Sequence, residues 1–204
     1  MGKQYEFVVN ATCGQARAGT LYTPHGNITT PTFMPVATQA TVKGLTPDEL
    51  VSVGVQMVLS NAYHLYLRPG TGLIRDMGGV REFMGWRGPV LTDSGGFQAF
   101  SLGSLTKVFA GGVVFKSHID GSEHTFTPET SITHQIEIGS TIAMCLDHCV
   151  AFPATRDEVE RAMKRTHEWA YRCKVAKEFA DPKSDQALFG IVQGGMFEDF
   201  RKES

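Results

Sequence analysis

The sequence lacks the features that mark several classes of protein. None of its 204 residues lie in an apolar run near the roughly 18 residues that a membrane-spanning helix needs. The amino terminus, MGKQYEF, carries charge where a secretory signal is apolar. The 19 Lys and Arg against 21 Asp and Glu give a net charge of −2, which excludes a broad basic field for nucleic acid. We expect a folded cytoplasmic domain that spans no membrane and contacts any polyanion only locally.

Cysteine and histidine are few and scattered. The four cysteines form no CxxC pair, and the seven histidines form no HxH or HExxH pattern. We therefore expect buried thiols, no disulfide framework and no metal bound wholly within this chain. The QGG string at 193–195 lacks both the Lys-Ser/Thr of a P-loop and the GxGxxG spacing of a dinucleotide site.

Turn residues and helix-start signals predict an α/β fold. Residues 1–32 contain short β segments broken by Gly and Pro, which predicts an N-terminal β-hairpin or small sheet. Over residues 33–204, short apolar runs alternate with helix-like stretches, which is typical of βα units around a parallel sheet. Helices should begin after Thr46, Thr127 and Thr155, where a capping threonine precedes a proline or a capping-box acid.

Four apolar runs end in a polar residue, namely Asn61, Asp93, Asp147 and Gln193. In a (β/α) barrel the carboxyl ends of the parallel strands carry the site residues, so these four become candidates together. Any one of them alone is better explained by an Asx turn, a helix cap or a satisfied polar side chain at a strand end. The recurrence of the pattern favours a site.

Two of these strand ends offer further chemistry. Asp93 precedes SGG at 94–96, a backbone that can approach a ligand closely and present N–H groups to it, although a plain strand–turn–helix junction has the same pattern. Asp147, His148 and Cys149 place an acid, an imidazole and a thiol side by side. Because neighbouring residues on extended backbone point to opposite sides, we expect no Cys–His dyad and a small buried cysteine.

Five motifs, in this order, resemble those of the tRNA-guanine transglycosylases and are most similar to the bacterial form. They are FMPVAT at 33–38, VKGL at 42–45, NAYHL at 61–65 with RPG at 68–70, LTDSGGFQ at 91–98 and GIVQGG at 190–195. The motifs run through nearly the whole chain, and several linked motifs are far more specific than the DSGG string alone.

The resemblance implies a zinc-containing (β/α)8 TIM barrel with the N-terminal antiparallel piece packed on it. The family exchanges guanine at the wobble position of GUN-anticodon tRNAs, of the Asp, Asn, His and Tyr type, for a 7-deazaguanine by double displacement. In bacteria the incoming base is the aminomethyl precursor of queuosine. Cleaving a ribose N-glycosidic bond builds oxocarbenium character, so two carboxylates are expected, one at C1′ and one for the base proton.

The same resemblance implies roles for individual residues. Asp93 would be the general acid/base, Asn61 the residue that holds it, and Phe97 the aromatic that stacks on the base. Carboxylate and amide side chains also suit the guanine edge, since Asp accepts from N1–H and the exocyclic amine while Gln donates to O6. The positions expected around the base are Asn61, Ser94, Gly95, Gly96, Phe97, Asp147, Cys149, Gln193 and Gly194.

Two parts of the family pattern have no counterpart in the sequence. They are the nucleophilic Asp of a later strand and the CxCxxC-plus-His zinc ligands. Because a (β/α)8 barrel takes about 250 residues, we expect the first half or so of the strands here, in an N-terminal fragment or truncated gene product that is inactive alone. The structural zinc would then be bound beyond residue 204. His148 stands where bacterial relatives usually carry Glu.

Several alternatives remain open. One is a non-catalytic tRNA-binding partner subunit of the same fold, against which the intact Asp93, Asp147 and Gln193 argue. Another is an archaeosine-type transglycosylase, which modifies the D-arm. A third is an unrelated (β/α) hydrolase or lyase that uses Asp93, which would bind no free 7-deazaguanine. A homodimer is possible, and the sequence does not fix which 7-deazaguanine is used.

Overall fold

A five-stranded parallel sheet forms the centre of the computed structural model, which describes residues 5–102, 106–183 and 185–204. Its strand order is β11-β10-β6-β5-β4, and each neighbouring pair runs parallel. The strands are β4 (Val36–Ala37), β5 (Val58–Ser60), β6 (Val90–Thr92), β10 (Ile142–Met144) and β11 (Ala187–Phe189). The predicted α/β class and parallel sheet are confirmed, because the apolar runs that end at the candidate polar residues are strands of this sheet.

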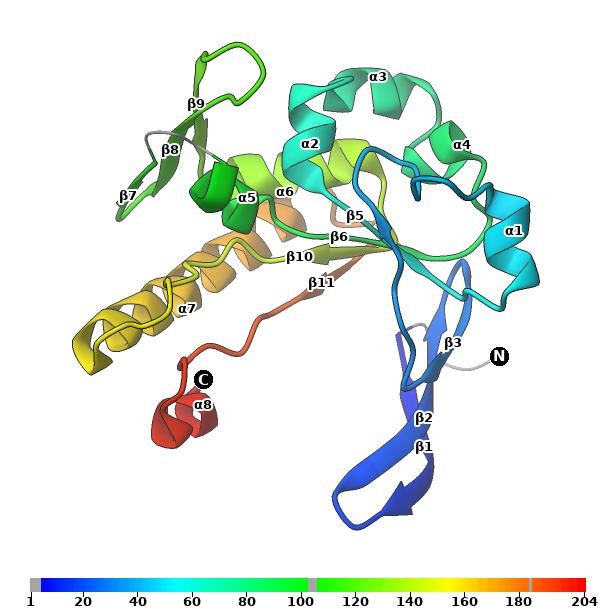
Figure 1. Cartoon of the computed structure of the whole chain (residues 1–204), viewed down its shortest axis with the longest axis horizontal. Helices are drawn as coiled ribbons and strands as arrows, with labels where there is room; N and C mark the ends of the chain where they lie inside the picture. The colour runs from blue at the N-terminus through cyan, green and yellow to red at the C-terminus, as the bar shows by residue number, and fades with distance from the viewer. Residues whose placement is uncertain (1–4, 103–105, 184) are drawn as a thin grey trace.

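Helices follow the strands, as the βα pattern predicted. They are α1 (Pro47–Ser52), α2 (Ala62–Leu67), α3 (Thr71–Asp76), α4 (Val80–Met84), α5 (Gly96–Leu102), α6 (Pro128–Ile138), α7 (Arg156–Ala180) and α8 (Glu198–Glu203). Thr46, Thr127 and Thr155 each cap a helix in a capping box, which confirms the three predicted starts. Figure 1 shows the long helix α7 running beside β10 and β11.

Two antiparallel sheets lie on opposite sides of the parallel sheet (Figure 1). The first contains β1 (Phe7–Cys13), β2 (Ala16–Thr23) and β3 (Gly26–Thr30), where an N-terminal hairpin or small sheet was predicted. The second contains β7 (Lys107–Phe109), β8 (Gly112–Lys116) and β9 (Glu123–Phe126) and was not predicted. Ala110-Gly111 joins β7 to β8 and Asp120-Gly121 lies between β8 and β9, so the turn signal was present in the sequence.

The N-terminal sheet covers the end of the parallel sheet that lies opposite the candidate site. Ile28 of β3 packs with Met57, which precedes β5, with Leu91 in β6 and with Ile142, the first residue of β10. Burying this apolar cluster closes that end of the sheet and leaves the carboxyl ends of the strands for polar residues. No helix in the described part of the chain is long and apolar enough to cross a membrane.

The cysteines are only partly as expected. Cys145 and Cys173 are buried, in a core shared by α2, α6, α7 and the second antiparallel sheet. Cys13 is exposed, because β1 is an edge strand whose residues all face solvent, and Cys149 is only half-buried. The expectation of buried thiols was therefore wrong for Cys13, where the short N-terminal sheet offers no second layer to cover the strand.

Candidate functional site

Asp93 follows β6 directly and is fixed by three hydrogen bonds from the α2 side and from its own loop. Asn61 Nδ2 donates to Asp93 Oδ2 at 2.6 Å, and the N–H groups of Ala62 and Gly95 donate to Oδ1 at 3.0 and 3.1 Å. Asn61 also caps α2, because its Oδ1 accepts from His64 N at 3.1 Å. These bonds fix the orientation of the Asp93 carboxylate. The orientation of Asn61 is in turn fixed by its bond to His64 N.

The surroundings of Asp93 shift the pKa of its carboxyl group toward neutral pH. Burial, and to a smaller extent the nearby charge of Asp147, raise the pKa of its carboxyl from 3.8 to about 6. Hydrogen bonds from the N–H groups of Ala62 and Gly95 and from the Gln98 side chain act in the opposite direction. A carboxyl group with a pKa near 6 can both give and take a proton near pH 7. No pattern in the sequence marked Gln98 as its partner.

The small residues after Asp93 bring its loop against the loop that carries Asp147. A Cβ on Gly96 would lie 3.2 Å from Asp147 O, and one on Gly95 would lie 2.8 Å from Cε2 of Phe126. Gly95 also has a φ of +77°, which side chains rarely adopt. Ser94 is buried, and its Oγ accepts from the N–H of Gly96 at 3.3 Å, so it stabilises the turn.

Asp147 and Gln193 meet across the ends of β10 and β11. Gln193 Nε2 donates to Asp147 Oδ2 at 2.9 Å. Burial raises the pKa of Asp147, and this hydrogen bond opposes the rise. Gly194 has a φ of +112°, and a Cβ there would lie 2.6 Å from Arg201 N, so this glycine lets the loop lie against α8. The four predicted strand-end residues thus form two hydrogen-bonded pairs, and the two carboxylates are close enough to affect each other.

Phe97 lies at the start of α5, four residues after Asp93, and 57% of its surface is exposed. A large aromatic ring with this exposure gains little from the core of the protein. The exposed part of the ring is suited to stacking on a flat ligand.

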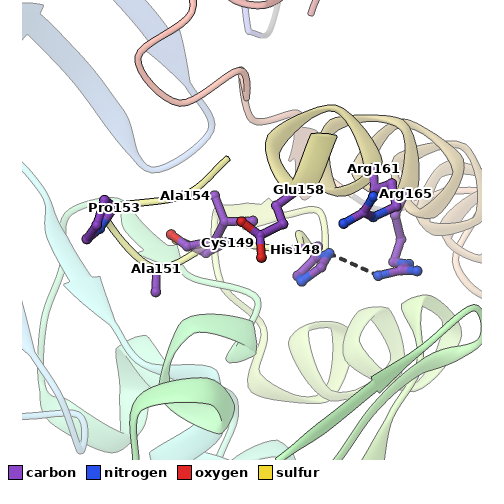
Figure 2. Close-up of a pocket in the computed structure, with 9 residues that line it drawn as sticks. His148, Cys149, Ala151, Pro153, Ala154, Glu158, Arg161 and Arg165 are labelled. Atoms are coloured by element: carbon purple, nitrogen blue, oxygen red, sulfur yellow. Dashed lines mark hydrogen bonds between the residues drawn. The ribbon is translucent and has the colours of Figure 1, made fainter. Parts of the chain in front are cut away.

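Cys149 lines a cavity of about 350 Å³ together with His148 and with Glu158 and Arg165 of α7 (Figure 2). Burial and the neighbouring carboxylate raise the pKa of the Cys149 thiol, so the nucleophilic thiolate is disfavoured at neutral pH. The His148 Nδ1 accepts from Arg165 Nη1 at 3.1 Å, and Figure 2 shows this bond directed away from the thiol. That His148 and Cys149 form no catalytic dyad stays a prediction.

The resemblance implies a zinc ion, and the metal-ligating side chains in the described part of this chain do not provide a site for it. Across residues 5–102, 106–183 and 185–204, no three His, Cys, Asp or Glu side chains are grouped so that they could hold a metal ion. The described residues therefore do not fit a zinc site.

Comparison with known proteins identifies the family. The family model described as queuine tRNA-ribosyltransferase matches residues 12–204. Proteins named queuine tRNA-ribosyltransferase from Pelotomaculum thermopropionicum, Halothermothrix orenii and Koribacter versatilis are 57%, 55% and 54% identical to the chain. The aligned regions cover 93%, 93% and 100% of this chain and 50%, 50% and 56% of those proteins. The chain spans about half the length of the curated relatives it matches, and it belongs to the queuine tRNA-ribosyltransferase family.

Proposed function

We propose that this chain supplies the base-recognition groups and the general acid/base of a tRNA-guanine transglycosylase. The observation that carries this proposal is a pair of carboxylates, Asp93 and Asp147, at the carboxyl ends of the neighbouring strands β6 and β10. One is held by Asn61 and two backbone N–H groups, while the other bonds the Gln193 amide. Different surroundings give two acids different tasks within one site.

Asp147 and Gln193 offer the groups that a guanine edge requires. A carboxylate accepts from the N1–H and the exocyclic amine, and a side-chain amide donates to O6. The two side chains lie within hydrogen-bond distance of each other, at 2.9 Å, so one base edge could contact both of them. Phe97, on the adjacent helix α5, supplies an exposed ring for stacking.

Asp93 is proposed to handle the proton of the base. When the bond between C1′ and the base nitrogen breaks, the base leaves with the electron pair and its nitrogen must be protonated. A carboxyl with a pKa of about 6 can donate that proton and take one back from the incoming base. Asn61 and the N–H groups of Ala62 and Gly95 hold its ionised form in place between the two half-reactions.

The complete reaction is proposed to need more than this chain. We infer that the carboxylate that attacks C1′ and the ligands of a structural zinc belong to the other half of the full-length relatives, together with the remaining strands of a (β/α)8 barrel. The proposed substrate is a GUN-anticodon tRNA of the Asp, Asn, His or Tyr type, and the incoming base is a 7-deazaguanine. A homodimer is the proposed assembly.

Base binding tests the recognition half of this proposal. Calorimetry should show binding of 7-deazaguanine and at least tenfold weaker binding of hypoxanthine, which lacks the exocyclic amine. Asp147→Asn should raise the Kd for 7-deazaguanine at least tenfold, because an amide has one acceptor oxygen and must turn its NH2 donor toward either N1–H or the exocyclic amine. Asp76→Asn, at an exposed position of α3, is the matched control and should bind as the parent chain does. Equal Kd values for 7-deazaguanine and hypoxanthine, together with equal Kd values for the parent chain and Asp147→Asn, would contradict the proposal.

Base exchange tests the catalytic half. Radiolabelled guanine is incubated with a GUN-anticodon tRNA and the purified chain, beside the same chain carrying Asp93→Ala. We expect no incorporation by the chain alone although 7-deazaguanine still binds. Incorporation by the parent chain that disappears in Asp93→Ala would support the acid/base role of Asp93. It would also refute the proposal that the carboxylate attacking C1′ lies outside this chain.

A further inference from the structure

Gln135 is a fully buried polar residue on α6, between strands β6 and β10. Its Oε1 accepts hydrogen bonds from Thr92 Oγ1 and Met144 N, each at 2.9 Å. Its Nε2 donates to Met144 O at 2.9 Å and to Ser131 Oγ at 3.3 Å. A side-chain amide has two donor hydrogens and two acceptor lone pairs, so the hydrogen-bonding capacity of Gln135 is fully used.

The bonds to Met144 continue the β6–β10 ladder at the point where the strands themselves stop pairing. The pairing of β6 with β10 ends at Thr92, the residue before Asp93. The next amide along β10, that of Cys145, donates to a carbonyl of β11, so the N–H and C=O of Met144 face the β6 side. Gln135 bonds both groups, as a backbone peptide of β6 would, so β6 needs no backbone group of its own there, while Asp93 N still donates to Ser60 O of β5 at 3.2 Å.

A second side chain of α6 holds the loop after Asp93. Ser131 lies one helical turn before Gln135, is 1% exposed, and donates from Oγ to Ser94 O at 2.9 Å. One helix therefore contacts both halves of the site. It reaches the Asp93 loop through Ser131, and it reaches β10, three residues before Asp147, through Gln135.

We propose that Gln135 is a positioning residue for the base exchange, because it sets the spacing of Asp93 and Asp147 through the strands that carry them. This inference rests on the proposed function, in which both carboxylates must contact one bound base. A shift of about 1 Å between them would misalign the acid/base group against a base held by Asp147. The amide does this because it is rigidly held by the helix on one side and by Met144 on the other.

Gln135→Met tests the proposal, because methionine keeps the length of the side chain and removes its hydrogen bonds. The Kd for 7-deazaguanine should rise about tenfold. The pKa of Asp93, followed by carbon-13 NMR, should fall from about 6 as Asp147 moves away and water enters. Ile138→Val, on the same helix, is the matched control and should leave both values unchanged. A folded Gln135→Met chain with the parent Kd and the parent pKa would overturn the proposal.

Gln135→Glu gives a second test that does not depend on the methionine variant folding. A protonated glutamic acid keeps one donor for Met144 O and a carbonyl acceptor, whereas the carboxylate has no donor. The Kd of the variant relative to the parent chain should fall toward 1 as the pH is lowered from 8 to 5.5, and a ratio independent of pH would count against the proposal. If the parent chain bound no 7-deazaguanine, the proposed function would fail alone, since the titration of Asp93 would still test the positioning role.

Discussion

Replacing Asp93 by asparagine should make the stability of the chain less dependent on pH. The folded chain raises the pKa of Asp93 from 3.8 to about 6, so it binds this proton more tightly than the unfolded chain does. The stability that comes from the protonated group is complete below pH 3.8 and is lost as the pH rises through about 6. Burial of the ionised carboxylate is the physical cause, and asparagine carries no charge at any pH.

The size of the effect follows from the two pKa values. The difference between 3.8 and about 6 corresponds to a loss of about 3 kcal/mol in the free energy of unfolding when the group is fully ionised. About 1 kcal/mol of this is lost by pH 4.5, which leaves about 2 kcal/mol between pH 4.5 and pH 7.5. The asparagine Nδ2 would face Asn61 Nδ2, which costs about 1–3 kcal/mol at every pH, so the slope and not the absolute stability is the test.

Urea denaturation at several pH values measures this slope. The fluorescence of Trp86 and Trp169, which are both buried, reports unfolding. The free energy of unfolding of the parent chain should fall by about 2 kcal/mol more than that of Asp93→Asn between pH 4.5 and pH 7.5. Asp76→Asn, an exposed position, should keep the slope of the parent chain. If Asp93→Asn showed the same slope as the parent, Asp93 would not titrate near pH 6 and the reasoning would be refuted.

Three further predictions test the loops around this carboxylate. Gly95→Ala should destabilise the chain by about 1–3 kcal/mol more than Gly54→Ala in urea denaturation. Both glycines have positive φ, but only at Gly95 would a Cβ lie within 3 Å of another atom, so equal losses would contradict the packing argument. Gln193→Ala should raise the pKa of Asp147 in an NMR titration, because the hydrogen bond that lowers it is removed; an unchanged or lower value would refute this. Phe97→Ala should change the free energy of unfolding by less than about 0.5 kcal/mol and weaken 7-deazaguanine binding, whereas unchanged binding would exclude stacking on this ring.

The sequence predicted the elements whose causes are local. Thr46 and Thr155 mark helix starts because a capping side chain bonds the backbone three residues later, and this needs no other part of the chain. Short apolar runs that end in Asn61 or Asp93 indicated buried parallel strands and the edge of the sheet where polar groups gather. The second antiparallel sheet was not predicted, although the turn residues Ala110-Gly111 and Asp120-Gly121 lie between its strands.

Only the tertiary structure determined which residues that are distant in the sequence lie close together in space. The raised pKa of Asp93 depends on burial and on Asp147, which lies far away in the sequence, and the role of Gln135 depends on the exact place where β6 and β10 stop pairing. Desolvation and hydrogen bonding act through space, and no local pattern records them. The sequence alone determined the candidate residues and the strands that bear them, whereas the fold determined the proton affinity of the acid and the side chain that holds the two carboxylates in register.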